Sequence, residues 1–366
     1  MDQLVGEQIL GNFYKGAKVF ITGHTGFKGA WMVYVLQKAG AILKGYSLAP
    51  DTEPSLYNNI QYGVDIQSVF ADINDAKKLR DEILSFQPDF VFHLAAQALV
   101  RRSYEAPVET FATNVIGTAN VLEALTLLER KCTAICITTD KVYENRESLH
   151  PYDESDRLGG YDPYSASKAC AEMVIKCYGQ SFFNTGKFNI HGKAIASVRS
   201  GNIIGGGDWC GDRLLPDIIR SLANNEEIII RNPSSIRPWQ HVLDPVHGYL
   251  QLGARLSKEP EKYSGAWNFG PDTANDVTVL DIAEKAIGIW GTGRIDIQTD
   301  PNAPHEAGLL KLDISKAMKE LKWKPVFDTW EAVSRTVNWY KSYYAGADSY
   351  KLMDADISHY ETLLRN

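Results

Sequence analysis

Short apolar runs alternate with longer amphipathic stretches through the first 204 residues of the chain. The apolar runs predict strands in the segments KVFIT, AILKGYSL, DFVFHLAA, TAICITT and AIASVRSGNII. The amphipathic stretches between them predict helices over about 27–38, 76–86, 114–128 and 165–178. Strands that alternate with helices in this way pair in parallel, with helices on both faces of the sheet. The pattern therefore predicts an α/β fold.

The character of the sequence changes after residue 204. Connections rich in Gly, Pro, Trp and Arg separate shorter elements there, and the segment AWNFGP returns to strand character. We therefore expect a Rossmann-type, doubly wound parallel sheet in residues 1–204, completed by residues 240–275. Residues 205–239 and 276–366 are predicted to form a smaller C-terminal lobe that closes over a substrate. The two parts would then interleave along the chain.

Composition and charge narrow the classes of function. With 366 residues, 44% of them hydrophobic, the chain can bury a large core. A net charge of -7 argues against a nucleic-acid binder, which needs clustered cations. No apolar run approaches the length of a membrane span.

The cysteines are odd in number and lack the spacing of a zinc site or a disulfide framework. They are Cys132, Cys136, Cys170, Cys177 and Cys210. We expect reduced thiols, no metal site and a cytoplasmic location.

Three glycines lie between the first predicted strand and the helix that follows it. Gly23, Gly26 and Gly29 are three residues apart, where glycine permits a tight turn and a close approach of backbone N–H groups to a pyrophosphate. This GxxGxxG spacing resembles that of the extended branch of the short-chain dehydrogenase/reductase superfamily. The second predicted strand ends without an immediate carboxylate or arginine, so its residues leave the choice between NAD and NADP open.

The resemblance implies a set of cofactor-binding residues and favours NAD. The set is Gly23, Thr25, Gly26, Phe27, Gly29, Asp72, Ile73, Leu94, Ala95, Ala96, Gln97, Tyr164 and Lys168.

A second group of polar residues follows the later strands. Tyr164 and Lys168 are four residues apart, so they share one face of a helix. The predicted strand TAICITT ends at Thr139 and Asp140 comes next, which brings all four side chains to the carboxyl edge of the sheet, where ligands bind in wound folds. An ammonium beside a phenol, together with a cationic nicotinamide, stabilises the phenolate, so we expect a lowered pKa for Tyr164.

These residues and the segments FITGHTGFKGAW, FHLAAQ, YDPYSASKACAE, SVRSGNIIGGGDW and RNPSSIRPWQHVLDP resemble the nucleotide-sugar 4,6-dehydratases, in particular those acting on CDP-glucose. The resemblance implies that Thr139 hydrogen-bonds the sugar 4-hydroxyl, Tyr164 takes its proton and Lys168 holds the nicotinamide ribose. It makes Asp140 the acid for the C6 hydroxyl. Lys141 stands where most hexose dehydratases have glutamate, and it is the candidate base for the C5 proton. The alternative is that Lys141 only pairs with a nearby carboxylate.

Three further residues are candidates for substrate binding. Arg213 and Arg237 carry planar guanidinium groups that suit the diphosphate of CDP-glucose. Asn202 resembles a superfamily asparagine that faces the substrate, with a turn-forming asparagine as the alternative. The superfamily often dimerises through the helix that carries Tyr164, so we expect a homo-oligomer.

Two other functions are compatible with parts of this pattern. An epimerase or reductase of the same superfamily would share the glycine turn and the Tyr164–Lys168 pair, but it has no leaving hydroxyl for Asp140 to protonate. A dinucleotide-sensing protein without catalysis would share the fold, and the presence of Thr139, Tyr164 and Lys168 argues against it.

Overall fold

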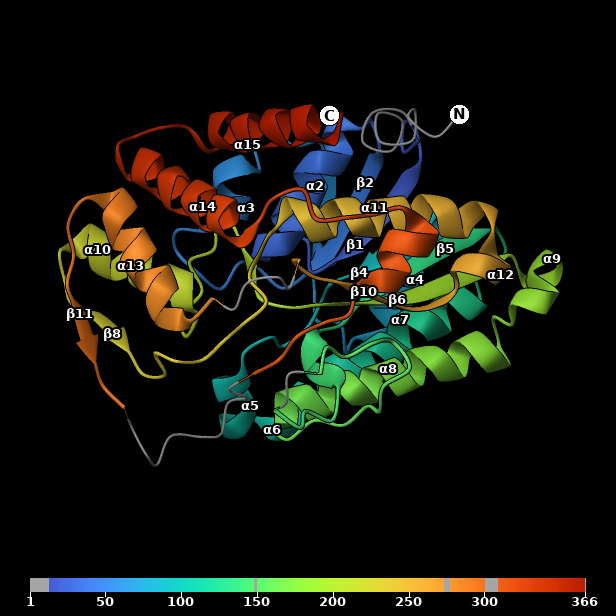
Figure 1. Cartoon of the computed structure of the whole chain (residues 1–366). Coiled ribbons are helices and arrows are strands. Elements are labelled where there is room, and N and C mark those ends of the chain that lie inside the picture. The colour runs from blue at the N-terminus through green and yellow to red at the C-terminus, as the bar shows by residue number, and fades with distance from the viewer. Residues whose placement is uncertain (1–12, 148–149, 273–276, 300–308, 366) are drawn as a thin grey trace.

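A seven-stranded parallel sheet forms the centre of the protein (Figure 1). The structure is a computed structural model that describes residues 13–147, 150–272, 277–299 and 309–365. The strand order is β10-β6-β5-β4-β1-β2-β3. The strands are β1 (Lys18–Thr22), β2 (Ile42–Ser47), β3 (Ile66–Phe70), β4 (Phe90–His93), β5 (Cys132–Ile137), β6 (Lys193–Ser200) and β10 (Gly265–Phe269). The predicted α/β fold with a Rossmann-type parallel sheet is confirmed.

Helices cover both faces of this sheet. In Figure 1, α2 (Phe27–Lys38) and α11 (Leu243–Lys258) lie above it, and α4 (Ala76–Phe86), α7 (Gly117–Thr126) and α8 (Pro163–Ser181) lie below it. Strand β1 shows how the alternation of side chains builds both layers. Val19 and Ile21 join the core under α2 and α11, whereas Phe20 joins the core under α4 and α7.

Local sequence explains where the helices begin. Asp75 caps α4 by accepting a hydrogen bond from the backbone N–H of Lys78, and Asp162 caps α8 through Ser165 in the same way. The helix expected from about residue 114 differs in detail, because a π-helical turn over Ala112–Ile116 precedes α7. Short helices complete this half: α3 (Leu56–Ile60), α5 (Val100–Glu105), α6 (Pro107–Phe111), α9 (Phe188–His191) and α12 (Pro260–Tyr263).

The remaining elements lie to one side of the carboxyl edge of the sheet (Figure 1). They comprise α10 (Leu214–Asn224), α13 (Val279–Trp290), α14 (Thr329–Tyr344) and two short strand pairs. The pairs are β8 (Ile228–Ile230) with β11 (Ile295–Ile297) and β7 (Ile203–Ile204) with β9 (Gln240–His241). Strand β10 pairs with β6, so the chain returns to the central sheet after it has built part of this region.

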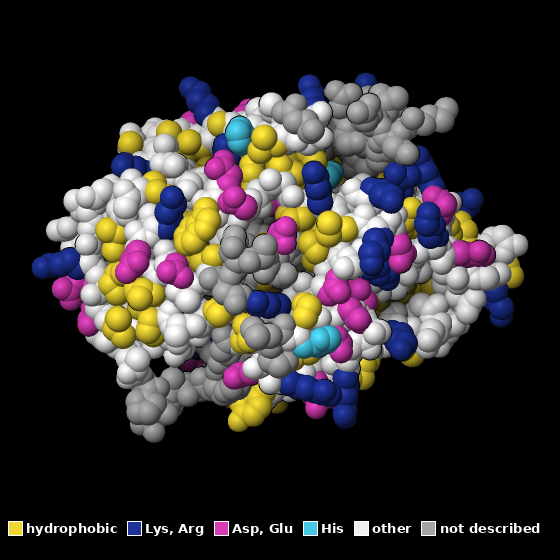
Figure 2. Space-filling view, in the orientation of Figure 1, with side chains coloured by type: hydrophobic (Ala, Val, Ile, Leu, Met, Phe, Trp, Pro, Cys, Tyr) yellow, Lys and Arg dark blue, Asp and Glu magenta, His cyan; other side chains and the backbone are white. Residues whose placement is uncertain are grey.

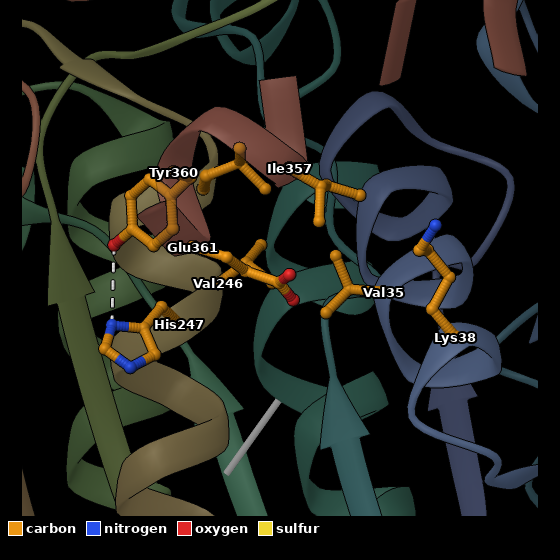
Figure 3. A pocket seen from close by; sticks show the side chains of 8 residues that line it. Val35, Lys38, Val246, His247, Ile357, Tyr360 and Glu361 are labelled. Carbon is orange, nitrogen blue, oxygen red and sulfur yellow. Dashed lines mark hydrogen bonds between the residues drawn. The ribbon is translucent and has the colours of Figure 1, made fainter. Parts of the chain in front are cut away.

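The C-terminal helix α15 (Ser349–Leu364) returns to the main body. Its buried Tyr360 donates a hydrogen bond to Asp244 on α11 over 3.0 Å and lies 3.4 Å from Nδ1 of His247 (Figure 3). A cavity of about 20 Å³ lies beside this contact, between α15, α11 and Val35 of α2. That volume is about the size of one water molecule, so α15 closes this side of the core almost completely.

The surface and the helices give no sign of a membrane or metal site within the described residues. No described helix has the length and apolar character needed to cross a membrane. No group of three or more His, Cys, Asp or Glu among these residues could hold a metal ion. On the face shown in Figure 2, Lys and Arg side chains are interspersed with Asp and Glu, so this face carries no continuous basic stripe.

Candidate active site

A cleft of about 1100 Å³ opens at the carboxyl edge of the sheet. Its lining includes the ends of β1 and β4, the point at which the strand order reverses and where wound folds bind ligands. All of the residues predicted for the cofactor, the substrate and catalysis line this one cleft. The fold therefore brings together residues that range from Gly23 to Arg237 in the sequence.

The glycine turn has the geometry of a tight approach between backbones. Gly23 has φ +72°, and a Cβ on it would lie 2.7 Å from the backbone N of Ala95. A Cβ on Gly29 would lie 2.1 Å from the carbonyl oxygen of Gly23. At Gly26 a Cβ would meet only an ordinary contact of 3.6 Å. Two glycines therefore let the turn close, and the third leaves space toward the cleft.

The beginning of α2 suits an anion. Gly26 is the N-cap and supplies no side chain to cap the helix, and the first turn contains no acidic residue. The first N–H groups of the helix and its positive dipole end therefore face the cleft without a protein partner from the cap. Together with the open space at Gly26, this arrangement fits the pyrophosphate of a dinucleotide.

Neutral hydroxyls occupy the end of β2, where many dinucleotide-binding folds place a carboxylate. Thr25 and Ser47 are hydrogen-bonded through their hydroxyls at 2.8 Å. Further along the lining, Asp72 is exposed and accepts hydrogen bonds from Asn74, while Ile73 is buried. Asp51 also lines the cleft. No Lys or Arg of β2 lines this end, which leaves a 2′-phosphate without a cation from that strand.

Gln97 lines the cleft and also forms hydrogen bonds that stabilise the turn after β4. Its side chain accepts a hydrogen bond from the backbone N–H of Leu99 at 2.6 Å and donates one to Thr110 at 2.9 Å. Asn114 bonds the Gln97 backbone in both directions and donates to Ser167 on α8. Both the side chain and the backbone of Gln97 therefore shape the turn after β4, which lines the cleft.

The predicted catalytic residues Thr139 and Asp140 adjoin at the end of β5. The Thr139 hydroxyl donates to the Asp140 carboxylate over 3.0 Å. Asp140 is 3% exposed, and burial raises its pKa, against the lowering effect of Lys141 and Arg237. A Cβ on Gly201 would lie 3.1 Å from the carboxylate, so Asp140 packs closely against the loop after β6. A buried carboxyl with a raised pKa is suited to donate a proton.

Tyr164 and Lys168 project from the first turns of α8 into the same site. Burial lowers the pKa of Lys168 to about 8, and its Nζ donates to the carbonyl of Ile137 at 3.3 Å. Burial raises the pKa of Tyr164 to about 12, and its hydrogen bond with Thr139 opposes that rise. Among the protein's own groups, desolvation outweighs the effects that lower the Tyr164 pKa. The expected lowering also includes the charge of a bound nicotinamide ring, so it stays a prediction. Any lowering has to come from the charge of the bound nicotinamide ring.

Lys141 lies partly buried beside Asp140. Within the described ranges, no carboxylate lies at ion-pair distance from its ammonium, and its backbone N–H points to the Thr139 hydroxyl at 3.4 Å. The charge of Lys141 acts on the neighbouring Asp140, so both roles of Lys141, as base and as partner of a carboxylate, stay predictions.

The predicted substrate residues line the same cleft. Arg213 pairs with Asp208 at 2.8 Å, which raises the pKa of the guanidinium further above its usual range. The charge of Arg237 reaches Asp140 and lowers the carboxyl pKa. Asn202 also lines the cleft, and its backbone carbonyl accepts a hydrogen bond from the backbone N–H of Gln240 at 3.0 Å.

Lys28 also lines the cleft and is not among the predicted site residues. Its Nζ lies 5.7 Å from the centre of the Tyr249 ring. Burial lowers the pKa of Lys28 to about 7, and the neighbouring charges of Lys168 and Arg213 act in the same direction. A lysine in the first turn of a helix is disfavoured by the helix dipole. That conflict, inside the glycine turn, is the signal that could have singled it out.

Comparisons with known proteins extend this picture. The GDP-mannose 4,6 dehydratase family matches residues 20–336 of the chain. The chain is 48% identical to a CDP-glucose 4,6-dehydratase of Salmonella typhimurium over 349 residues, which cover 95% of this chain and 97% of that protein. It is 26% identical to a dTDP-glucose 4,6-dehydratase of an Actinoplanes species over 341 residues, which cover 89% of this chain and 98% of that protein.

Solved structures share the fold. A dTDP-glucose 4,6-dehydratase from Streptomyces venezuelae, with NAD bound, matches with a TM-score of 0.75 and 22% identity over 89% of this chain and 97% of that one. A UDP-glucose 4-epimerase from Thermotoga maritima matches with a TM-score of 0.76 and 22% identity over 89% of this chain and 99% of that one. At these identities the likeness shows the architecture, which dehydratases and epimerases share.

Proposed function

The chain belongs to the GDP-mannose 4,6 dehydratase family, and we propose that it catalyses the NAD-dependent 4,6-dehydration of CDP-glucose. The products are CDP-4-keto-6-deoxyglucose and water, so the enzyme is a hydro-lyase. Support comes from the 48% identity to a CDP-glucose 4,6-dehydratase over nearly the full length of both chains.

One structural observation carries the choice of a dehydratase over an epimerase. A buried carboxyl, Asp140, with a raised pKa lies beside Thr139 and Lys141, in the cleft that also holds Tyr164. A 4-epimerase has no hydroxyl to expel, whereas a dehydratase needs a proton donor for the C6 hydroxyl as it leaves. A raised pKa favours the protonated form of the carboxyl that this step requires.

The first step that the residues support is the oxidation of C4. Thr139 holds the 4-hydroxyl, Tyr164 takes its proton, and the Lys168 ammonium stabilises the phenolate state that accepts it. Bound NAD would supply the redox chemistry by accepting the C4 hydride and later returning it to C6. The glycine turn and the start of α2 would hold its pyrophosphate, and Lys168 its nicotinamide ribose.

The second step is the loss of water. The 4-keto group acidifies the C5 hydrogen, Lys141 removes that proton as an amine base, and Asp140 protonates the C6 hydroxyl as the C6–O bond breaks. Reduction at C6 and return of a proton to C5 then give the 6-deoxy sugar. Because the hydride that leaves C4 would return to C6, the reaction has no net redox change and needs no second substrate.

In this proposal, two parts of the chain bind different ligands in the cleft. Residues 1–204 with 240–275 bind the cofactor, and residues 205–239 with 276–366 bind the nucleotide. Arg213 and Arg237, from the second part, bind the diphosphate, and Asn202, near the end of the first part, faces the sugar or phosphates. Support comes from the guanidinium groups that line the cleft, with Arg213 already held in place by Asp208.

We also propose that two copies associate through the helix that carries Tyr164. Val108, Ile116 and Met173 are large apolar side chains that are 80%, 54% and 53% exposed on or beside α6, α7 and α8. Exposed apolar groups on packed neighbouring helices mark a surface that a second copy can cover. Gel filtration of a Met173→Glu variant is expected to show the loss of the dimer.

The biological setting follows from the proposed product. A CDP-linked 4-keto-6-deoxy sugar is a precursor for 3,6-dideoxyhexoses of bacterial surface polysaccharide such as the O-antigen of lipopolysaccharide. A CDP-paratose 2-epimerase of Salmonella typhi, 24% identical to this chain, shows that a related enzyme acts on a CDP-linked sugar. We place the enzyme in the cytoplasm, in line with five cysteines that are all free thiols.

An isotope experiment tests the proposed reaction. The enzyme is incubated with CDP-glucose that carries deuterium at C4, and the product is analysed by NMR and mass spectrometry. We expect the deuterium at C6 of a 4-keto-6-deoxy sugar, because the hydride leaves C4 and returns to C6. Deuterium that stays at C4 of a hexose with its C6 hydroxyl intact would show an epimerase and contradict the proposal.

A further inference from the structure

The loop between β7 and α10 carries Arg213 into the cleft, and it is held by a residue far away in the sequence. Tyr340 lies on α14, 132 positions after Asp208. We propose that Tyr340 is a positioning residue for substrate binding: its hydroxyl fixes the backbone of Asp208, and Asp208 holds the guanidinium of Arg213 in the cleft. This inference rests on the proposed role of Arg213 in binding the diphosphate.

The hydroxyl of Tyr340 bonds Asp208 twice. It accepts a hydrogen bond from the backbone N–H of Asp208 at 2.7 Å and donates one to the backbone carbonyl of the same residue. Tyr340 is 0% exposed and Asp208 is 5% exposed. Both backbone groups would lose their partner without the hydroxyl, in a place where water has little access.

The carboxylate of Asp208 connects the backbone held by Tyr340 to Arg213 in the cleft. One carboxylate oxygen accepts from the backbone N–H of Cys210 at 3.2 Å, and the other accepts from Nη1 of Arg213 at 2.8 Å. The first bond sets the direction of the chain after Asp208, and the second fixes the end of the Arg213 side chain. An arginine held in one orientation loses less conformational freedom when a diphosphate binds.

The backbone around Asp208 fits against α14 without room to shift. A Cβ on Gly206 would lie 2.0 Å from the Trp339 ring, and Gly207 has φ +89° with its Cβ position 2.7 Å from Leu56. The ring of Trp209 lies 5.7 Å from that of Tyr340, edge to face. The loop is therefore clamped between α14 and α3, and Tyr340 supplies the polar contacts within that clamp.

The same loop also reaches the cofactor side. A Cβ on Gly205 would lie 3.2 Å from Cζ of Phe27, which belongs to the glycine turn. One end of the loop thus contacts the residues proposed to bind NAD, and the other end carries Arg213. The position of the loop sets how far apart the two ligands are held.

Substitution of Tyr340 by Phe tests the proposal, because it removes the hydroxyl and keeps the ring. The affinity for CDP is measured by titration calorimetry on the full-length protein with NAD present, which needs no turnover. We expect Tyr340→Phe to weaken CDP binding about tenfold, as expected when a pair of buried hydrogen bonds is lost. In steady-state assays the KM for CDP-glucose should rise by a similar factor, while kcat changes by less than about twofold.

A buried tyrosine elsewhere provides the matched control. Tyr360 on α15 is also buried, and its hydroxyl donates to Asp244 at 3.0 Å. Tyr360 does not line the cleft and lies beside His247 (Figure 3). Tyr360→Phe should lower the thermal stability at least as much as Tyr340→Phe, but leave CDP affinity unchanged. If both variants weaken CDP binding equally, the effect of Tyr340 is one of general stability and the positioning role is overturned.

A double-mutant cycle identifies the route of the effect. Arg213→Met should weaken CDP binding, and Tyr340→Phe should then add nothing further in that background. An equal loss from Tyr340→Phe with or without Arg213, or no loss from Arg213→Met, would overturn the proposed route. Failure of the wild-type enzyme to release a 4-keto sugar from CDP-glucose would contradict the proposed reaction alone, because the CDP titrations do not depend on it.

Discussion

Asp140 and Lys141 are neighbours in the sequence, but their side chains have different surroundings. The Asp140 carboxyl is buried, bonded to Thr139 and has a raised pKa. The Lys141 ammonium is partly exposed and has no carboxylate partner within the described part of the chain. An acid and a base of this kind can act on adjacent carbons of one sugar. The proposed elimination therefore depends on two residues whose roles can be separated by substitution.

Substitution of Asp140 by Asn should stop the reaction after the oxidation of C4. Asparagine keeps the shape and can accept from Thr139, but it cannot donate a proton to the leaving hydroxyl. We expect kcat to fall by about a hundredfold to ten-thousandfold. Bound reduced cofactor should accumulate and appear as absorbance at about 340 nm, the usual signal of reduced nicotinamide. Normal turnover by Asp140→Asn, or a loss of the absorbance change together with the product, would contradict the role of Asp140 as the acid.

Substitution of Lys141 by Met should block the removal of the C5 proton. Methionine has a similar length and no amine, so removal of the C5 proton should fail while C4 oxidation continues. The measurement is the incorporation of solvent deuterium at C5 of recovered sugar, by mass spectrometry. We expect incorporation with the wild-type enzyme and none with Lys141→Met. A variant that still exchanged the C5 proton would show that another residue is the base.

At the scale of elements, the turn between β1 and α2 contains glycines with different tasks. Gly29 lets the helix pack onto the turn, because a Cβ there would lie 2.1 Å from the oxygen of Gly23. Gly26 has φ -73°, which any residue can adopt, and a Cβ there would point into open space at the cleft. Gly29 is therefore required by the packing of the fold, whereas Gly26 leaves space for the proposed ligand.

A pair of alanine substitutions should separate these tasks. Gly26→Ala should leave the melting temperature of the protein without cofactor unchanged and weaken NAD binding, because its methyl group enters the space proposed for the pyrophosphate. Gly29→Ala should lower the melting temperature itself, by the cost of relieving a backbone clash. Differential scanning calorimetry and NAD titration give both quantities. Equal NAD affinity for Gly26→Ala and the wild type would place the pyrophosphate elsewhere.

The sequence predicts these elements well where one local cause dominates. The helices over 27–38 and 76–86 have the predicted bounds, since an amphipathic pattern and a clear start agree there. The helix expected from 114 begins with a π-helical turn, because Asn114 is bonded to Gln97 and Ser167 from other elements. Tertiary contacts of this kind leave no periodic trace in the sequence.

Tertiary contacts also limit what the sequence predicts about the site. The pattern predicts the glycine turn and a helix over about 165–178, but α8 runs from Pro163 to Ser181, because Asp162 caps it and Pro163 begins it. The rise in the Tyr164 pKa could not be predicted, because desolvation depends on the whole surroundings. The link from Tyr340 to Arg213 spans more than 120 positions, so nothing in the local sequence of either residue indicates it.

At the scale of the whole molecule, the C-terminal helix depends on a buried acid in the core. Asp244 is 0% exposed, and its carboxylate accepts from the backbone N–H of Val326 and from the hydroxyl of Tyr360. Burial raises the pKa of Asp244 to about 7. The folded protein therefore holds a proton on this carboxyl at pH values where the unfolded chain has lost it.

The stability of the protein should depend on pH through this group. Between pH 4 and 7, about the interval from its ordinary pKa to its raised one, the folded state binds the extra proton. Asp244 thus reduces the free energy of unfolding as pH rises, by up to about 1.4 kcal/mol per pH unit. Asp244→Asn removes this dependence and keeps an acceptor for Tyr360. In thermal unfolding, the melting temperature of the variant relative to that of the wild type should rise from pH 5 to pH 8. A constant difference in melting temperature would mean that Asp244 keeps an ordinary pKa.

The most direct test of the central claim is a comparison of substrates. The purified enzyme with NAD is incubated with CDP-glucose, dTDP-glucose and GDP-mannose in parallel, and each mixture is assayed for the absorbance that 4-keto-6-deoxy sugars develop in alkali. We expect a signal with CDP-glucose alone, which would establish both the reaction and the nucleotide. A signal with another nucleotide only would contradict the proposed substrate, and no signal with any of the three, although NAD is bound, would contradict the proposed reaction.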